Sequence, residues 1–263
     1  MTVEHGTEPI EAIAREAGML LSSYFQSSSL RTAAKGFLDV VTQADTESEA
    51  LVVSRLRELF PDDAIVGEEG TNAKGGNGRV WYVDPLDGTF NFSRGIPFWC
   101  VSIGLVMDGE PSLAVLFDPV RDEMFTAKRG QGAWLDGHPI AASSVSDPME
   151  ATVQLTLNYD RERIEVSISD FNAVARGVMR LRNMGALALE LAFVACGRLD
   201  AVCQRGSHPW DYAAGVLVCT EAGAVVTNTD GSAFDLATDD ALAGSTPELH
   251  RALRALLDAR ALR

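Results

Sequence analysis

Hydrophobic residues recur at helical spacing in two stretches near the start of the chain. In residues 9–27, apolar side chains return at steps of three and four residues, which predicts an amphipathic helix. A second helix is predicted over residues 45–60. Asp45 or Thr46 is expected to be its N-cap, and Glu49 lies where it completes a capping box.

The middle of the chain has the alternation of a β-sheet. Val80–Val83 is a run of aromatic and β-branched residues that favours a half-buried strand. Pro85 is expected to end this strand because proline has no N–H for the ladder. Residues 99–137 then alternate strands with turns, as a β-meander does. Two connections precede this region. Residues 27–39, between the two helices, are expected to form an irregular segment or a hairpin, and residues 71–79 a flexible loop.

After about residue 143 the pattern changes to strands alternating with apolar helices. The whole layout predicts one α/β unit over residues 9–263, with an N-terminal lobe of about 9–142 and a C-terminal lobe of about 143–263. In the second lobe we expect strands at 151–159, 199–204 and 224–228, and helices at 168–179, 185–197, 209–223 and 248–262.

The charge of the chain narrows its partners. The 263 residues carry 37 acidic against 22 basic side chains, a formal net charge of -15. A balance of this sign disfavours nucleic acid and anionic membranes as partners, and it is compatible with cations. A solvated acidic surface would account for most of the excess by itself.

The cysteines and the chain start indicate a compartment. Cys100, Cys196, Cys203 and Cys219 each lie in or beside an apolar run and form no CxxC pair, so we expect reduced thiols in a cytoplasmic protein and no zinc site. The first residues contain no basic start followed by a long apolar run, so no signal peptide is expected. The apolar stretches are too short and interrupted to span a bilayer.

Acidic residues gather at four places where predicted elements begin or end. If the fold brings these ends together, they form a pocket of oxygen ligands without sulfur or imidazole, which suits Mg²⁺ or Mn²⁺. Taken singly, each place also has an ordinary explanation as a turn, a solvated loop or a helix start. The four are Asp39 and Asp45 in "DVVTQAD", Glu68 and Glu69 in "VGEEG", Asp84 and Asp87 in "VDPLDGT", and Asp211 in "HPWDYAAG".

The residues that follow Asp84 point to a phosphate. Gly88 lets the backbone approach a ligand closely, and the N–H groups after it can form an anion nest. A phosphate beside Asp84 and Asp87 needs cations that cancel the carboxylate charge. With two metal ions in that position, a water molecule hydrogen-bonded to Thr89 would attack the phosphorus.

In order and spacing, these blocks resemble the inositol monophosphatase family of Mg²⁺-dependent, lithium-sensitive phosphatases. The resemblance runs from about residue 9 to residue 263, and the "DPLDGT" and "WDYAAG" blocks together are highly specific. It implies an α/β fold with alternating αβαβα layers, a homodimer, and two or three Mg²⁺ ions, with Mn²⁺ as a substitute.

The resemblance also implies roles for individual residues. Glu68, Asp84 and the backbone carbonyl of Leu86 would bind metal, with Asp84 as a bridging ligand, and Asp87 and Asp211 would bind the second metal. Asp45, Thr89 and Glu68 would be the catalytic residues, the first two orienting the attacking water, and Thr42 would support Asp45. The substrate-binding residues would be Asp87, Gly88, Thr89, Gly185, Ala186, Gln204 and Asp211.

Two departures from the family pattern put the leaving group in doubt. Gln204 replaces a glutamate that accepts a sugar hydroxyl in the animal enzymes, and Leu187 is bulkier than the usual alanine and is expected to narrow the sugar pocket. Arg182 and Arg205 flank this pocket and would either meet an anionic leaving group or lie on the surface. Lys35 lies near the family's active-site hairpin, with no role that the sequence assigns.

The sequence therefore predicts a Mg²⁺-dependent phosphomonoesterase that acts on a small phosphorylated metabolite, foremost inositol 1-phosphate. The alternatives are histidinol phosphate and fructose 1,6-bisphosphate, and, more remotely, a non-catalytic descendant that binds metal or phosphate. Near the site, His208 is expected to pack or to bind backbone. The neighbouring aromatic residues Phe90, Phe92, Phe98, Trp99 and Trp210 are expected in the core.

Overall fold

The computed structural model of the chain describes residues 6–27, 30–36, 39–158 and 163–259. The helices are α1 (Glu8–Tyr24), α2 (Gln43–Leu59), α3 (Thr89–Ser93), the 3-10 turn η1 (Pro148–Glu150), α4 (Ile164–Ala175), α5 (Leu187–Ala195), α6 (Pro209–Glu221) and α7 (Pro247–Ala259). The strands are β1 (Thr32–Gly36), β2 (Asp39–Thr42), β3 (Ala64–Gly67), β4 (Asn72–Ala73), β5 (Arg79–Asp87), β6 (Cys100–Met107), β7 (Glu110–Asp118), β8 (Glu123–Lys128), β9 (Gly132–Leu135), β10 (His138–Pro139), β11 (Thr152–Leu155), β12 (Arg180–Arg182), β13 (Ala201–Arg205), β14 (Val225–Thr227) and β15 (Asp240–Gly244).

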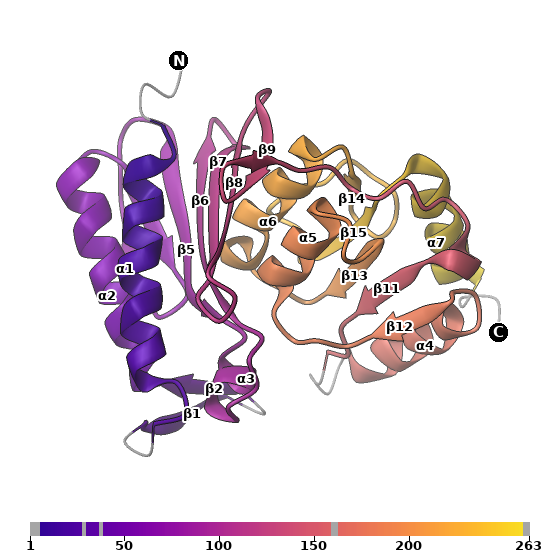
Figure 1. Cartoon of the computed structure of the whole chain (residues 1–263), viewed down its shortest axis with the longest axis horizontal. Coiled ribbons are helices and arrows are strands. Elements are labelled where there is room, and N and C mark those ends of the chain that lie inside the picture. The colour runs from indigo at the N-terminus through magenta and orange to yellow at the C-terminus, as the bar shows by residue number, and fades with distance from the viewer. Residues whose placement is uncertain (1–5, 28–29, 37–38, 159–162, 260–263) are drawn as a thin grey trace.

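These elements form five layers (Figure 1). Helices α1 and α2 cover the outer face of an eight-stranded sheet with the order β10-β9-β8-β7-β6-β5-β3-β4. Helices α5 and α6 lie between this sheet and a five-stranded sheet with the order β12-β11-β13-β15-β14. Helices α4 and α7 cover the far face of the smaller sheet. The predicted alternating αβαβα fold is confirmed.

Three hydrophobic clusters fill the spaces between the layers. The cluster around α5 and α6 contains residues of both sheets, including Leu116 from β7 and Val202 from β13. Gly104 of β6 allows close packing here, because a Cβ at this position would lie 2.8 Å from the backbone nitrogen of Ala214 in α6. Apart from Glu190 in α5 and the two ends of α6, the central helix pair is apolar, as expected for helices buried on both sides.

The N-terminal predictions are confirmed with one correction. Helix α1 and the hairpin of β1 and β2 lie where they were predicted. Helix α2, however, starts at Gln43, with Thr42 as its N-cap and Asp45 as the third helical residue of a capping box. The Thr42 hydroxyl accepts the Ala44 N–H, so the expected cap at Asp45 or Thr46 and the expected capping role of Glu49 are wrong.

The predicted end of β5 is also wrong. The strand continues past Pro85 to Asp87, and its pairing with β6 shifts register between Asp84 and Asp87. A bulge of this kind leaves a residue outside the ladder, so the missing N–H of proline costs no hydrogen bond there. The β-meander of β6–β9 is confirmed, and the predicted flexible loop 71–79 contains the short strand β4.

The second lobe matches the prediction in its main elements. Helices α5, α6 and α7 and strands β11, β13 and β14 are confirmed, whereas α4 begins at Ile164 rather than at residue 168. Strands β12 and β15 were not predicted. Strand β12 has only three residues, and β15 is defined by its pairing with both β13 and β14, so neither is indicated by its local pattern alone. None of the helices that the described residues form is long and apolar enough to cross a membrane.

Candidate active site

The bulge in β5 determines where the two aspartates of "DPLDG" point. In a regular strand, residues three apart point to opposite faces of the sheet. Here Asp84 pairs with Ser102 and Asp87 pairs with Cys100, two residues that are only two apart on β6. The extra residue in β5 therefore brings both carboxylates to the face that packs on α5 and α6.

Four carboxylates from three separate segments act on one another at this face. Burial raises the pKa of Asp84 well above its usual range, and the negative charges of Glu68, Asp87 and Asp211 raise it further. Glu68 also shares a side-chain hydrogen bond with Asp84. Asp84 is 2% exposed. Four of the predicted acidic residues thus converge on one place, although the aspartates at positions 84 and 211 are 127 positions apart in the sequence.

Asp87 joins the two lobes through the start of α5. Its carboxylate accepts the N–H groups of Leu187, Ala188 and Leu189 at 3.1, 2.7 and 3.3 Å. These are donors without a partner inside the helix, and a negative charge is favourable at that helix end. Burial and the charge of Asp211 nevertheless raise the pKa of Asp87 well above its usual range. The Leu187 side chain itself is buried in the central cluster.

Asp45 and Thr89 form a second feature beside these acids. The Thr89 hydroxyl lies 2.8 Å from Asp45 Oδ1 and 3.0 Å from the carbonyl oxygen of Leu86. It has one proton and donates to one of these acceptors at a time. Asp45 Oδ2 accepts the Thr42 N–H at 2.9 Å and also the Thr42 hydroxyl. Burial raises the pKa of Asp45, and these hydrogen bonds oppose the rise. The predicted support of Asp45 by Thr42 is confirmed.

Gly88 holds a backbone conformation that a side chain would disturb. Its φ is 93°, and a Cβ would lie 3.0 Å from both the carbonyl oxygen of Phe98 and the Cβ of Ala186. The turn therefore passes directly beside the start of α5. Phe90, which follows this turn, is 61% exposed, so its predicted place in the core is wrong. The short helix α3 turns its ring outward and buries Phe92 instead.

The loop that carries Glu68 is fixed from below by Glu49. The Glu49 carboxylate accepts the N–H groups of Glu69 and Thr71 at 2.6 and 3.0 Å. A Cβ on Gly67 would lie 2.4 Å from the Glu49 carboxylate, so a larger residue there would displace this carboxylate from the loop. The "GEEG" stretch is thus a loop held by hydrogen bonds, and Glu68 in it is half-buried and interacts with Asp84.

Asp211 stands at the start of α6, where it accepts the His208 N–H at 2.7 Å. The His208 ring is largely exposed and stacks on Trp210, with ring centroids 4.7 Å apart. Trp210 is half-buried rather than in the core. Gln204 lies on the neighbouring strand β13, five residues before the start of the helix that presents Asp211, and donates to the Ser207 hydroxyl at 2.7 Å.

The basic residues of the predicted pocket have different surroundings. Arg205 is held internally by Asp170 and Asp240 at 2.7 and 3.1 Å, so its charge is matched within the protein. Arg182 is exposed on β12 and donates to the carbonyl oxygen of Leu181. Neither is oriented by a contact with the acidic residues of the site. The side chain of Lys35 lies outside the described part of the structure.

Comparison with known proteins shows the family of this chain. The sequence model of the inositol monophosphatase family matches residues 3–261. The chain belongs to the inositol monophosphatase family. It is therefore a phosphatase, an enzyme that hydrolyses phosphoric monoesters.

Three similar proteins each cover most of this chain. "Inositol monophosphatase 2" of Solanum lycopersicum is 42% identical over 86% of this chain and 88% of its own length. "Nus factor SuhB" of Escherichia coli K12 is 36% identical over 92% of this chain and 91% of its own. The crystal structure of extragenic suppressor protein suhB from Bartonella henselae superposes with a TM-score of 0.92, at 30% identity, over 95% of this chain and 97% of that one.

The donor set of the site fits the metal dependence of the family. Its side chains offer only carboxylate oxygens, and the neighbouring Leu86 carbonyl faces the Thr89 hydroxyl. Hard oxygen donors of this kind suit Mg²⁺ or Mn²⁺, and a cation would relieve the repulsion that raises the pKa of Asp84. Within the described ranges, however, no three His, Cys, Asp or Glu side chains form a finished metal-binding cluster. The carboxylates bind protein N–H groups and one another instead.

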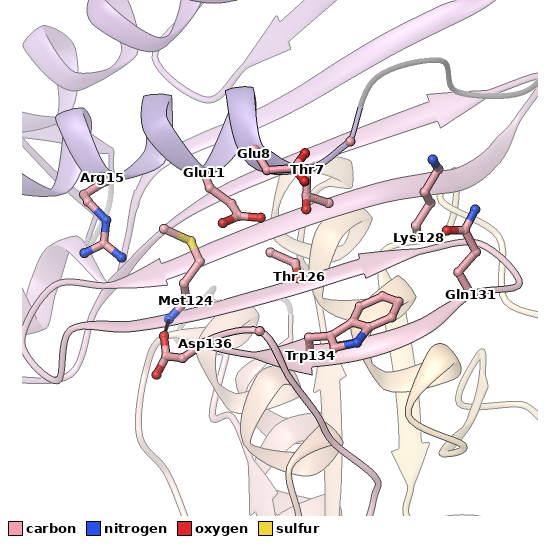
Figure 2. Close-up of a pocket in the computed structure, with 12 residues that line it drawn as sticks. Thr7, Glu8, Glu11, Arg15, Met124, Thr126, Lys128, Gln131, Trp134 and Asp136 are labelled. Carbon is pink, nitrogen blue, oxygen red and sulfur yellow. Dashed lines mark hydrogen bonds between the residues drawn. The ribbon is translucent and has the colours of Figure 1, made fainter.

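A separate cavity of about 660 Å³ lies between the start of α1 and strands β8 and β9 (Figure 2). Glu11 and Lys128 lie on its two sides, and the Trp134 ring forms part of its floor. None of the predicted site residues lines it. This cavity therefore lies apart from the candidate active site.

Sequence analysis missed Asn91 and Glu190, which support the site, and gave Glu49 a different role. Asn91 donates to the carbonyl oxygens of Phe98 and Met184 at 2.9 and 2.8 Å and so ties the Gly88 turn to the second lobe. Glu49 anchors the Glu68 loop, as described above, and Glu190 is a fully buried acid on α5. The acid within the otherwise apolar run "GALALELAFVACG" was a usable signal for Glu190. The roles of Asn91 and Glu49 depend on contacts that no local pattern shows.

Proposed function

We propose that this phosphatase hydrolyses a small polyol phosphate, foremost inositol 1-phosphate, with water as the nucleophile and Mg²⁺ as the cofactor. The observation that carries the proposal is the convergence of Glu68, Asp84, Asp87 and Asp211 beside the Gly88 turn. Carboxylates that raise one another's pKa in this way call for cations, and a turn with free N–H groups suits a phosphate.

In this proposal the carboxylates of the site divide into two sets. Glu68, Asp84 and the Leu86 carbonyl would hold one Mg²⁺, and Asp84, Asp87 and Asp211 would hold another, with two or three ions in all. Bound Mg²⁺ would neutralise the phosphate charge and lower the pKa of a bound water. The N–H groups of Gly88 and Thr89 would bind the phosphate oxygens.

Asp45 and Thr89 would orient the attacking water. With its proton on Asp45, the Thr89 hydroxyl presents its free lone pairs to a water molecule, which can donate to them. Asp45 is buried and hydrogen-bonded on its other oxygen, so it is positioned to accept a proton through Thr89. Glu68, which shares a hydrogen bond with Asp84, would hold the same water.

The leaving group would lie between the start of α5 and the end of β13. Gly185 and Ala186 border the Gly88 turn, and Gln204 offers an amide that can bind a hydroxyl. The charge of Arg205 at this end of β13 is already balanced by ion pairs with Asp170 and Asp240, so Arg205 is not available to bind a second phosphate. This favours inositol 1-phosphate and histidinol phosphate over fructose 1,6-bisphosphate.

The test is a panel of phosphate esters under one Mg²⁺ condition. We expect inositol 1-phosphate to give the highest kcat/KM, no turnover with EDTA, and inhibition by high Li⁺. Asp211→Asn should lower kcat by about a hundredfold or more while the far-UV circular dichroism is unchanged. Phosphate release that persists in EDTA would contradict the metal assignment, and a preference for histidinol phosphate would change the substrate.

We also propose a homodimer in a reducing compartment, the cytoplasm. Strand β12 is an unpaired edge of the smaller sheet, and Met149, Met179 and Ile168 are exposed near it. The four cysteines are free thiols. Light scattering should give a mass near twice 28.2 kDa. Met179→Asp should lower that mass, and a monomer in the unmodified protein would contradict the proposal.

A further inference from the structure

Glu190 is an acid with an unusual position in the middle of the molecule. It lies on α5 between the two sheets and has no exposed surface. Its Oε1 accepts the Gly185 N–H at 2.7 Å and the Ala186 N–H at 3.3 Å. These two N–H groups belong to the turn that opens α5, so the side chain folds back onto the entrance of its own helix.

The second oxygen of Glu190 is buried without a hydrogen bond. So are the amide oxygens of Gln154 on β11 and Gln204 on β13. Gln154 lies opposite Val202, a residue of the central cluster, so its side chain faces α5. Unpartnered buried oxygens are rare in proteins, so the two on Glu190 and Gln154, which face each other between α5 and β11, require an explanation.

The orientation of the Gln154 amide supplies one. Its nitrogen donates to Thr156 Oγ1 at 3.3 Å, while its oxygen has no partner. The Gln154 side chain lies within hydrogen-bonding reach of Glu190. If the amide turns by 180°, its nitrogen donates to Glu190 Oε2 and its oxygen accepts the Thr156 hydroxyl. Both oxygens are then satisfied, and a continuous hydrogen-bonded chain links β11 to the start of α5.

This chain meets the catalytic face on both sides. The N–H groups that directly follow Ala186 are those that hold Asp87. The carbonyl oxygen of Met184, just before Gly185, accepts from Asn91 of the first lobe. The backbone of residues 184–189 is therefore hydrogen-bonded to Asn91 and Asp87 on the side of the proposed substrate, and to Glu190 on the interior side. Burial raises the pKa of Glu190 to about 7 because the charged carboxylate is disfavoured in the interior.

We propose that Glu190 is a positioning residue: together with Gln154 it fixes the Gly185–Ala186 turn, and thereby the leaving-group pocket and the N–H groups that orient Asp87. The inference rests on the proposed function, because it assigns the pocket to a polyol and Asp87 to Mg²⁺. Glu190 touches neither the substrate nor the metal and acts through the backbone of the turn.

Two substitutions at this position separate the hydrogen bonds from the charge. Glu190→Gln keeps an acceptor for Gly185 and Ala186 and adds an amide that can donate to Gln154, so kcat/KM should stay within about threefold of the unmodified enzyme. Glu190→Leu removes the acceptor. It should raise KM for inositol 1-phosphate by about tenfold or more, with a smaller change in kcat.

Metal binding gives a readout that does not depend on turnover. Titration calorimetry with Mn²⁺ alone should show weaker binding by Glu190→Leu, by about fivefold or more, and near-unchanged binding by Glu190→Gln. If Glu190→Leu does not fold, Gln154→Leu leaves the Glu190 bonds to the turn in place. That variant should still raise KM by about threefold.

Asp200 provides a matched control at the opposite end of β13. Its buried carboxylate accepts the Thr152 N–H at 2.7 Å and the Ser143 hydroxyl at 2.5 Å. Asp200→Leu should lower the Tm as Glu190→Leu does, without a change in KM or in the Kd for Mn²⁺.

Three results would overturn the proposal. The first is an unchanged KM in Glu190→Leu or, if that variant fails to fold, in Gln154→Leu. The second is a loss of kcat/KM in Glu190→Gln as large as in Glu190→Leu, and the third is the same rise in KM in Asp200→Leu. If the unmodified protein released no phosphate from inositol 1-phosphate, the proposed function itself would fail instead.

Discussion

At the scale of single residues, the site is built from groups that destabilise the metal-free protein. Asp84 and Asp87 are nearly fully buried, and each has a raised pKa because burial and neighbouring carboxylates disfavour its charge. Function and stability therefore oppose each other at these positions. The energetic cost belongs to the same atoms that we propose as metal ligands.

This opposition leads to a prediction for Asp84→Asn. A carboxyl whose pKa is higher in the folded than in the unfolded state binds more protons when folded, so stability falls as pH rises above the unfolded value near 4. The amide does not titrate and escapes this loss. In EDTA at about pH 8 the variant should have a Tm higher by about 3 °C or more, and at about pH 4 the difference should vanish.

Calorimetry at the two pH values checks this prediction, with the Mg²⁺-dependent hydrolysis measured in parallel. The hydrolysis should be lost by about a hundredfold or more. A variant that is less stable at the higher pH, or whose advantage is the same at both, would show that repulsion at Asp84 is not the dominant cost.

Thr89 allows a second test at this scale. Its hydroxyl joins Asp45 and the Leu86 carbonyl at 2.8 and 3.0 Å. Thr89→Val keeps the shape but cannot hold a water, so kcat should fall by about a hundredfold with an unchanged Kd for Mn²⁺. Thr89→Ser should retain most of the activity. Stopped-flow phosphate release and calorimetry measure the two effects, and a valine variant with normal kcat would remove Thr89 from the mechanism.

At the scale of elements, the geometry of the site is produced by irregular features. The bulge in β5 turns Asp84 and Asp87 to one face, and the start of α5 provides the N–H groups that hold Asp87. The positive φ of Gly88 brings the turn against Ala186. Regular strands and helices supply the rigid frame, and the chemistry is placed where that regularity ends.

Gly88→Ala tests this reading, with Gly109→Ala as a matched control. The φ values are 93° and 85°, so both alanines are strained by roughly 1–2 kcal/mol. At Gly109 nothing lies within 4 Å of the new Cβ, whereas at Gly88 it meets Phe98 and Ala186 at 3.0 Å. Both variants should lower the free energy of unfolding in urea, but only Gly88→Ala should lose activity.

At the scale of the whole molecule, the candidate site lies where the eight-stranded sheet meets helices α5 and α6. The central cluster joins both sheets through α5 and α6, and Asn91 and Asp87 cross between the halves by hydrogen bonds. An interface so apolar and continuous makes independent motion of the lobes costly. We infer that the two lobes hold the site as one cooperative unit.

Unfolding should accordingly be a single transition. Leu191→Ala removes packing in the central cluster and should lower the free energy of unfolding by roughly 2–5 kcal/mol. The fall in Tm should be the same whether it is recorded by the tryptophan fluorescence of the first lobe or by far-UV circular dichroism. Trp81 and Trp99 are the buried fluorophores of the first lobe. Two separated transitions would show that the lobes fold independently.

Much of this protein followed from local patterns. Periodicity placed the two N-terminal helices, the meander and the apolar helices of the second lobe, because each buries one face or both along its length. The failures lie where tertiary contacts overrule local preference. Pro85 did not end β5 because the bulge accepts it, and Thr42 rather than Asp45 caps α2 because Asp45 turns toward Thr89.

The sequence by itself determined which oxygen ligands exist and that they stand at the ends of elements, because residue type and local periodicity are written directly in the order of the chain. Only the tertiary structure decided that Asp87 is held by N–H groups one hundred residues away, and that Glu190 and Glu49 brace the loops around it. Those contacts come from the packing of α5 between two sheets. No local window of sequence contains both partners of such a contact.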